Sequence, residues 1–562
     1  MTSQPRLPGD ILLEILAAAE TPYAARMMAV SRFLYVEGAK VILRRPIYLY
    51  REKELVKFLA FLDTDLHRLD FVHTLDIRLH TVNEDVFVKF LGALYNMPNI
   101  RSLSIALHSR TQLHQVLAIL DMRAQNSEYP GLYEVLHSLT LDIFGLEAPS
   151  ANKLVRALPR MCNLRSLSIA SGDLLLEVHP DLASAFSAIT SLKSFQMGYT
   201  HDHGISLLQN LRSQLVSVNL NFLPIGGGLA FFDFVSDVEL LQLHPVALLA
   251  HSQASLEKLD AFGWTTHSAL PPNVDCVYPK MRHLDLEHTS IPLTMPYIRA
   301  YPNLTHLRYE TSECEMVDSE STALHDHQHR LNVADQLASG LTWRCLQDFH
   351  GSVVDLYMLG LTCRIERVYL QVVHPKVFYQ LAAALAHAQP RHLELSNWPG
   401  KPTGPDEETF TIMRGQGASR LESLHFTAGL GQGDEGVDFP VLMENLKDSL
   451  SHSSLRDLKA KIRLSGLDPR PDDLRREFAH LQRHCLRASL PALRPSPEPT
   501  DYPLVDAEQS ANRFDLEHYT RSLVSAVPTL REVEITLLGP RDRWRRATLV
   551  SGRVQCEDKE SV

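Results

Sequence analysis

Cysteine is scarce in this 562-residue chain, and its few thiols follow no pattern that a cross-linked or zinc-binding protein would need. Their number is odd, no CxxC pair occurs, and the gaps between them have no framework spacing. We therefore expect free thiols and a cytosolic or nuclear protein, because disulfides persist in oxidising compartments. The cysteines are Cys162, Cys276, Cys314, Cys345, Cys363, Cys485 and Cys556.

Long hydrophobic runs and an excess of positive charge are also missing. No stretch reaches the ~18 consecutive apolar residues of a membrane span, and no apolar leader follows the N-terminus. The net charge is −11, which disfavours a polyanionic partner, because phosphate binding needs clustered lysine and arginine. The basic run Arg541–Arg546 is more typical of a solvated chain end. The composition thus predicts neither a membrane nor a nucleic acid as partner.

What the chain does have is an ordinary folded composition, with 45% hydrophobic and 22% charged residues. At ~150 residues per domain, its length suggests several domains or one extended repeat array. A six-residue figure, apolar-x-x-apolar-x-apolar, recurs at intervals of roughly 23 to 36 residues. Its copies lie at 72–77, 100–105, 136–141, 164–169, 192–197, 215–220, 238–243, 256–259, 281–286, 304–307, 365–370, 391–395, 421–426, 455–458 and 530–535.

The figure predicts a strand, and the helical patterns that follow it predict a return connection. Helices are expected at Asp85–Tyr95, Asn152–Leu158 and Lys376–His387, for example. A single strand–helix unit cannot bury its own apolar side, so units must stack into a solenoid. Over roughly residues 70–540 the chain resembles leucine-rich repeats, which implies an α/β fold with parallel strands on a concave face.

The repeats depart from that family at one position. Regular repeats carry asparagine or cysteine three residues past the figure, where it forms a ladder between turns. Without this ladder, the solenoid is expected to be irregular. The corresponding residues here are His80, His108, Phe144, Gly172, Leu223, Trp264, Thr289 and Ser312.

Three segments interrupt the repeats, and the chain end differs from them. Glu310–Ser321 is acidic and is predicted to be a loop, while Arg330–Leu361 is predicted to contain a helix at Ala334–Phe349. The proline-rich segment Ala488–Glu508 is predicted to be a non-helical excursion. We expect a solenoid over 51–540 and a charged, disordered tail at 541–562.

The first fifty residues read as a separate helical domain. Pro8 suits the first turn of a helix, Asp10 lies near the positive end of its dipole, and an apolar stripe follows. Further helical segments are predicted at Tyr23–Tyr35 and Val36–Leu43. So small a domain cannot bury this much apolar surface without a partner.

The opening Leu7–Leu16, the later Val30-Ser31-Arg32 and the exit through Arg44, Arg45 and Tyr48 together resemble the F-box, in the form common in fungal F-box proteins. One departure is that the family's usual aromatic residue falls on Leu34, with Phe33 displaced by one position.

The resemblance implies a substrate receptor of a cullin–RING (SCF-type) ubiquitin ligase, with no catalysis and no cofactor of its own. The N-terminal helices would bind a Skp-type adaptor and through it a cullin, while the concave strand face would hold an unknown target protein. Target contacts would come from outward positions such as Arg101, Ser104, Arg165, Arg282, Asp285, Glu394 and Glu422. The implied adaptor-binding residues are Leu7, Pro8, Ile11, Leu12, Ile15, Leu16, Val30 and Leu34.

Two other classes stay open. The N-terminal helices could be only the cap that a repeat array needs, which would make the protein a non-catalytic scaffold. An enzyme or enzyme activator would need a polar cluster on the concave rim, and the sequence motifs do not favour one. His325, His327 and His329 are read as a solvated run rather than a metal site, and so is His201-Asp202-His203. Gly226–Gly228 lacks the flanking residues of a phosphate-binding loop.

Overall fold

The computed structural model describes residues 7–79, 81–125, 131–143, 146–222, 244–264, 276–289, 292–311, 319–371, 378–399, 415–431, 433–451, 453–464, 467, 504–539, 544–550 and 552–559. The chain forms two compact units. The first comprises Met1–Trp264 and Ser268–Met281, and the second comprises Thr265–His267 and Arg282–Val562.

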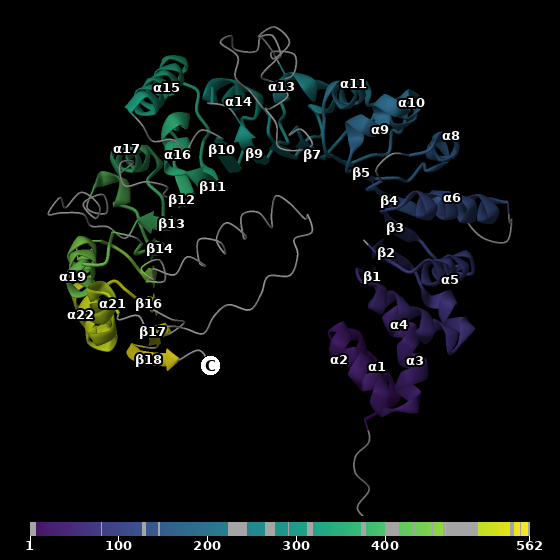
Figure 1. The fold of residues 1–562 in the computed structure, drawn as a ribbon, viewed down its shortest axis with the longest axis horizontal. Coiled ribbons are helices and arrows are strands. Elements are labelled where there is room, and N and C mark those ends of the chain that lie inside the picture. Colours follow the sequence, from purple (N-terminus) through teal and green to yellow (C-terminus); the bar gives the residue numbers. More distant parts are fainter. Residues whose placement is uncertain are drawn as a thin grey trace, which may run out of the picture. The chain divides into compact units, whose positions relative to one another are not determined.

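Strands and helices alternate in both units, as the repeat pattern predicts (Figure 1). Eighteen strands occur among the described residues. Within each unit they form a mostly parallel, open sheet with helices on one side, so the α/β leucine-rich-repeat-like solenoid is confirmed.

In the first unit, each strand pairs in parallel with the next strand along the chain. The apolar positions of the figure face the helices and are buried, as at Leu103, Leu167 and Val218, each 0% exposed. The strands are β1 (Ile47–Leu49), β2 (Thr74–Arg78), β3 (Ser102–Leu107), β4 (Leu136–Leu141), β5 (Ser166–Ile169), β6 (Ser194–Met197), β7 (Ser217–Asn221) and β8 (Lys258–Phe262).

The helices of the first unit supply the other half of its core, as Phe90 and Leu94 of α5 do. The α-helices are α1 (Gly9–Ala18), α2 (Thr21–Val30), α3 (Arg32–Leu43), α4 (Glu52–Asp63), α5 (Glu84–Tyr95), α6 (Arg110–Ala124), α7 (Leu132–Val135), α8 (Ala148–Ala157), α9 (Gly172–Val178), α10 (Pro180–Ser187), α11 (Asp202–Asn210) and α13 (Pro245–Leu248). The 3₁₀ turns are η1 (Leu66–Phe71), η2 (Leu158–Arg160) and η4 (Ala250–Ser252).

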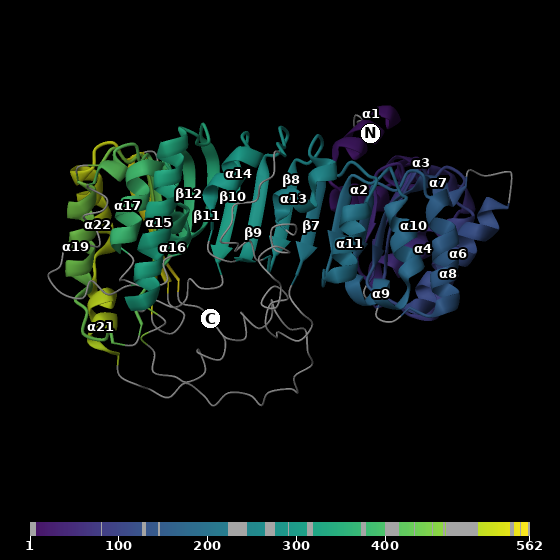
Figure 2. The ribbon, with the colours of Figure 1, turned by 90° about the horizontal axis from the view of Figure 1, so that it is seen from above.

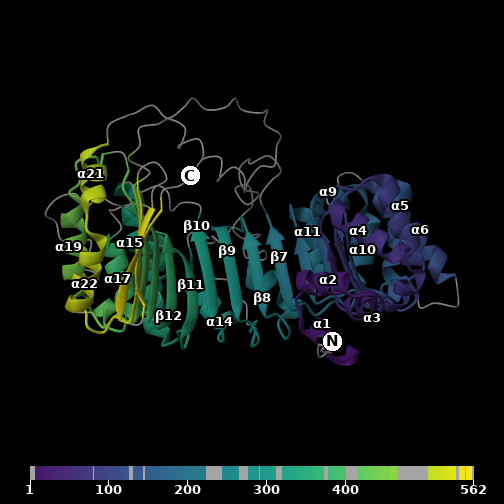
Figure 3. The same cartoon turned by 90° about the horizontal axis from the view of Figure 1, so that it is seen from below.

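The second unit repeats this plan and ends in a hairpin. Its strands lie side by side in chain order and are parallel up to β16 (Figure 3). They are β9 (His283–Thr289), β10 (His306–Thr311), β11 (Leu346–Ser352), β12 (Ile365–Gln371), β13 (His392–Pro399), β14 (Ser423–Gly429), β15 (Asp457–Arg463), β16 (Glu532–Leu538), β17 (Trp544–Val550) and β18 (Arg553–Lys559). The helices are α14 (Thr294–Ala300), α15 (Ser319–Ser339), α16 (Val353–Leu359), α17 (Phe378–Ala388), η7 (Gln416–Ala418), α19 (Phe439–Leu450), α21 (Asp506–Arg513) and α22 (Leu516–Ala526).

Side chains just before the strands tie neighbouring repeats together. Asn99 donates to the carbonyl of Asp70, and Asn163 donates to that of Glu134, both at 2.7 Å. Ser191 does the same to Leu164, also at 2.7 Å. The asparagines that precede the figure therefore bond neighbouring repeats.

The predicted helix over Ala334–Phe349 is confirmed only as far as Ser339 and is wrong beyond it. Helix α15 ends at Ser339, because Gly340 adopts a left-handed conformation with φ of 65°. The residues that follow form β11, an additional strand whose irregular spacing hid it from the repeat pattern.

The chain end also differs from the predicted disordered tail. Residues 544–550 form β17 and residues 553–559 form β18; β17 pairs antiparallel with β16, and β18 pairs antiparallel with β17. This hairpin pairs the backbone of β16, whose edge would otherwise be open, and buries Ala547 completely.

Some predictions fall outside the described residues. These are the repeat copy at 238–243, Gly226–Gly228, most of the acidic segment at 310–321 and most of the proline-rich segment at 488–508. Of the last, residues 504–508 are described, and 506–508 form the first turn of α21, so this part is helical rather than non-helical as predicted.

The buried His244 gives the first unit a pH-dependent stability. Burial lowers the pKa of this imidazole to about 4, and its Nδ1 lies 3.3 Å from the backbone N–H of Val246, which donates to it. The folded state therefore favours the neutral ring. As the pH falls from 6.5, the unfolded chain takes up the proton first, and stability declines until about pH 4.

We expect this single group to contribute a decline of at most about 3 kcal/mol. The measurement is urea unfolding of wild type and of His244→Leu between these pH values, followed by intrinsic fluorescence. The free energy of unfolding of wild type, relative to that of His244→Leu, should fall as the pH falls, because only wild type carries this imidazole. A difference that is independent of pH would contradict the assignment.

Candidate functional site

The N-terminal helices form a small bundle with a core of its own. Leu16, Ala24, Met28, Leu34 and Ala39 are buried against one another between α1, α2 and α3. The helices come close at Gly38, where a Cβ atom would lie 3.0 Å from Leu16 Cδ1 and 3.2 Å from Met28 Cγ.

The helix boundaries differ from the predicted ones. The second helix ends at Val30 rather than Tyr35, since Ser31 is extended, with φ of −147° and ψ of 133°. The third helix accordingly begins at Arg32.

One side of this bundle is fixed to the first repeat. The Arg68 guanidinium stacks 4.6 Å from the ring centroid of Tyr35 and 4.0 Å from that of Phe61, so it joins α3 to α4. Arg45 donates to the carbonyls of Ala19 at 2.8 Å and Leu16 at 2.7 Å, and it also bonds Ala17. These bonds satisfy the last carbonyls of α1.

The other side of the bundle, on α1, is apolar and exposed. Helix α1 projects beyond α2 and α3 at the edge of the unit (Figure 2). Leu7 is 57% exposed, Ile11 37% and Ile15 43%. Ile11 and Ile15 are four residues apart and lie on one face of the helix, while Leu7 precedes its first turn. We call these three residues the α1 stripe.

The implied adaptor-binding residues therefore separate into two groups. Besides the α1 stripe, Pro8 and Val30 are exposed, the latter at 80%. Leu12 is half-buried and packs against the bundle core, while Leu16 and Leu34 are fully part of it. A direct contact with a partner is thus available to the exposed group only.

Sequence reasoning set Phe33 aside, but the structure places it beside the exposed group. Its side chain is 44% exposed, and its ring lies so close to Gly9 that a Cβ there would be 2.9 Å from the ring. Phe33 thus extends the apolar surface around the start of α1. Gly9 is the sequence feature that could have indicated this contact, because only a residue without a side chain lets an aromatic ring lie so close to the backbone.

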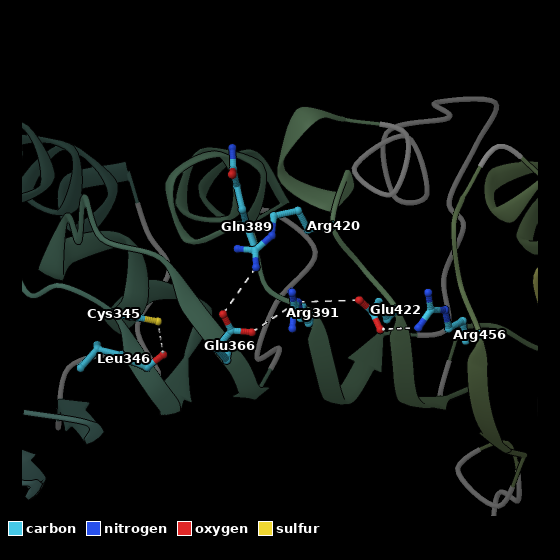
Figure 4. Close-up of polar contacts among 8 residues, drawn as sticks. All are labelled: Cys345, Leu346, Glu366, Gln389, Arg391, Arg420, Glu422 and Arg456. Carbon is cyan, nitrogen blue, oxygen red and sulfur yellow. Dashed lines mark hydrogen bonds and ion pairs between the residues drawn. The ribbon is translucent and has the colours of Figure 1, made fainter.

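The second candidate surface is the outward side of the strands in the second unit. At the position just before β13, β14 and β15, charges of alternating sign form a ladder with Glu366 of β12 (Figure 4). Arg391 lies 3.6 Å from Glu366 and 3.7 Å from Glu422, and Arg456 lies 3.2 Å from Glu422. Arg420 also lies 3.4 Å from Glu366. These solvent-exposed pairs contribute little stability.

Further along the strands, most charged side chains are also paired. Arg308 contacts Glu287 at 2.7 Å, and Asp348 contacts His306 at 2.8 Å and Arg367 at 2.6 Å. Of the outward residues predicted for target binding, Asp285 lies 3.8 Å from Arg308, and Arg282 donates to the carbonyl of Asn303.

A Ser423, His425 and Asp457 cluster has residues of a hydrolytic triad but not its geometry. Asp457 Oδ2 accepts from Ser423 at 2.8 Å and lies 2.7 Å from His425 Nε2, which is also 3.3 Å from Ser423 Oγ. Burial alone would raise the pKa of Asp457, but the bonds from His425 and Ser423 outweigh it and lower the pKa. A triad histidine uses different nitrogens for the serine and the carboxylate, so this cluster activates no nucleophile.

The histidine run lies on helix α15, and it is not uniformly solvated as predicted. His325 is buried, His327 is exposed, and His329 Nδ1 lies 2.7 Å from the carbonyl of Tyr357. The three imidazoles therefore do not share a face. In the described part of the chain, no group of three or more metal-ligating side chains is suitably arranged.

The described cysteines are free thiols, and burial raises the pKa of Cys363 to about 12. Among the helices of the same described ranges, none combines the length and apolarity needed to cross a bilayer.

Comparison with known proteins identifies no family for this chain. No protein-family model matches it, and no curated protein matches its sequence.

Adjacent residues of α1 should respond differently to truncation. Leu16→Ala leaves a cavity in the bundle core and should cost about 2–5 kcal/mol of unfolding free energy. Ile15→Ala, one residue away and exposed, should change it by no more than about 0.5 kcal/mol. Urea unfolding followed by far-UV circular dichroism measures both. Equal losses would show that the α1 stripe is part of the core.

Proposed function

We propose that this protein is a substrate receptor of an SCF-type ubiquitin ligase, whose N-terminal bundle binds a Skp-type adaptor and whose repeats hold a target protein. The observation that carries the proposal is the exposed α1 stripe on a bundle that already has its own core. Apolar side chains on one helix face are stabilised when a partner covers them.

The sequence pattern and the exposed positions support the same partner. Leu7, Pro8, Ile11 and Ile15 belong to the segment that resembles the F-box, and all four are exposed. Burying an aliphatic side chain completely contributes ~1.5–3 kcal/mol. Because the α1 stripe already loses part of its surface to the bundle, its three residues together would contribute on the order of 4 kcal/mol.

The second function that the sequence allowed, a scaffold whose helices are only a cap, has support where the bundle meets the first repeat. Arg68, Tyr35 and Phe61 join α3 to the first repeat, and β1 extends the sheet from β2. Capping accounts for this side. It does not account for the α1 stripe, which is exposed.

In this role the protein would catalyse nothing. It would hold its target near a ubiquitin-conjugating enzyme, so that a bimolecular encounter becomes a local one. The scarce, free cysteines fit a reducing cytosolic or nuclear compartment.

The test is binding of a purified Skp-type adaptor to the full chain, measured by calorimetry. Leu7→Ala/Ile11→Ala/Ile15→Ala should weaken binding by about 100-fold or more, since it removes about 3 kcal/mol of apolar contact. Circular dichroism should stay that of wild type, because the three side chains are exposed.

A matched control is Val88→Ala/Val178→Ala, which truncates two side chains of α5 and α9 that are 51% and 63% exposed. It should bind the adaptor as wild type does. No adaptor binding by wild type, or equal binding by the triple variant, would refute the receptor role. Loss of helical signal in the triple variant would favour the cap.

A further inference from the structure

Strand β15 presents a row of cations that differs from the rest of the outward face. Lys459, Lys461 and Arg463 occupy successive outward positions, and all three are exposed. Within the described residues none of them has an ion-pair partner, whereas Arg308 on β10 and Arg367 on β12 each contact a carboxylate. We call these three residues the β15 row.

The carboxylate opposite Lys459 already has another ion-pair partner. In the register of the two strands, Lys459 faces Glu534 of β16. Glu534 instead bonds Arg546 of β17, at 3.0 Å. The hairpin at the chain end thus leaves Lys459 without its cross-strand partner.

Hydrogen-bond donors surround the middle of the row. Lys461 faces Thr427 of β14 on one side and Thr536 of β16 on the other, and Thr536 faces Arg546 of β17. This run across four strands combines two cations with two hydroxyls. Such a set of groups suits a carboxylate, which accepts hydrogen bonds from both types of donor.

These side chains border a hollow of about 440 Å³ that also has an apolar end. Leu538 and Trp544 face each other on β16 and β17 and line it. Glu394 lines its far side on β13. A ligand that fits must therefore carry a few negative charges over β15 and one apolar group over the hairpin.

We propose that the β15 row and this hollow bind an extended acidic peptide, with carboxylates at alternate positions and an apolar side chain at one end. Alternate residues of a strand lie about 6.7 Å apart, and an extended peptide repeats its side chains at the same interval. Each carboxylate can therefore meet one cation of the row.

A nucleic acid suits this surface less well. Glu394 and Glu534 border the hollow, and the chain as a whole carries a net charge of −11. Both would repel a long polyanion, while a short peptide with a few charges fits between the two glutamates. As the place where the target protein docks, this surface rests on the proposed function, although peptide binding itself does not require the adaptor.

The test is fluorescence anisotropy of a labelled short peptide with glutamate at every second position and a terminal leucine, titrated with the full chain. Lys459→Glu/Lys461→Glu should weaken binding at least about tenfold, and Lys459→Gln/Lys461→Gln should weaken it less. Affinity should also fall as salt rises from about 50 to about 200 mM.

The control variant is Lys53→Glu/Lys57→Glu, which makes the same change in net charge on two exposed lysines of α4. It should bind within about twofold of wild type. A peptide of the same composition with its glutamates contiguous, and one with glutamine in their place, should both bind more weakly, because they lose the spacing or the charge.

The proposal would be overturned if wild type did not bind the peptide. It would also be overturned if Lys459→Glu/Lys461→Glu bound the peptide as tightly as the control Lys53→Glu/Lys57→Glu. Tighter binding of a single-stranded oligonucleotide would overturn it as well, since the row would then be a phosphate site. Adaptor binding, measured separately, should be unchanged in Lys459→Glu/Lys461→Glu. If wild type binds the peptide but not the adaptor, the receptor role is refuted while the peptide-binding site is supported.

Discussion

Each repeat has one apolar side that it cannot bury alone, and the rest of the structure depends on this constraint. Leu103 and Leu167 are 0% exposed because the strand of one repeat lies between its neighbours and is covered by helices such as α5 and α6. Backbone bonds between parallel strands then fix which side chains point outward. The outward positions are free of packing demands, so their charges can serve binding.

At each end of the repeat array, one apolar surface has no neighbouring repeat to cover it, and the two ends differ in what covers this surface. At the C-terminal end, β17 pairs with β16 and β18 with β17, so this hairpin covers the edge of β16. At the N-terminal end, α3 packs on the first repeat through Arg68, while α1 keeps Ile11 and Ile15 exposed. The same bundle thus has one side for stability and one available to a partner.

Charge on the outward face of the second unit follows a similar division. Cross-strand pairs such as Arg308 with Glu287 offset most of it, and each such exposed pair adds little to stability. The β15 row departs from this balance, because Arg546 on the added hairpin takes the glutamate that faces Lys459. An element with a structural role at the chain end therefore decides which cations stay available.

The sequence by itself determined the α/β repeat fold, because an apolar figure with a regular period leaves the chain no other way to bury it. It also placed the bundle at the start and located the exposed Ile11 and Ile15, but it could not separate them from Leu16 and Leu34. Apolar residues occur around much of α1, so only packing against α2 and α3 decided which side is core. Strand β11 and the final hairpin likewise came from tertiary structure, since Gly340 ends α15 early and β16 offered an open edge. The β15 row needed register as well, because a lysine becomes available or neutralised only through the strand that lies beside it.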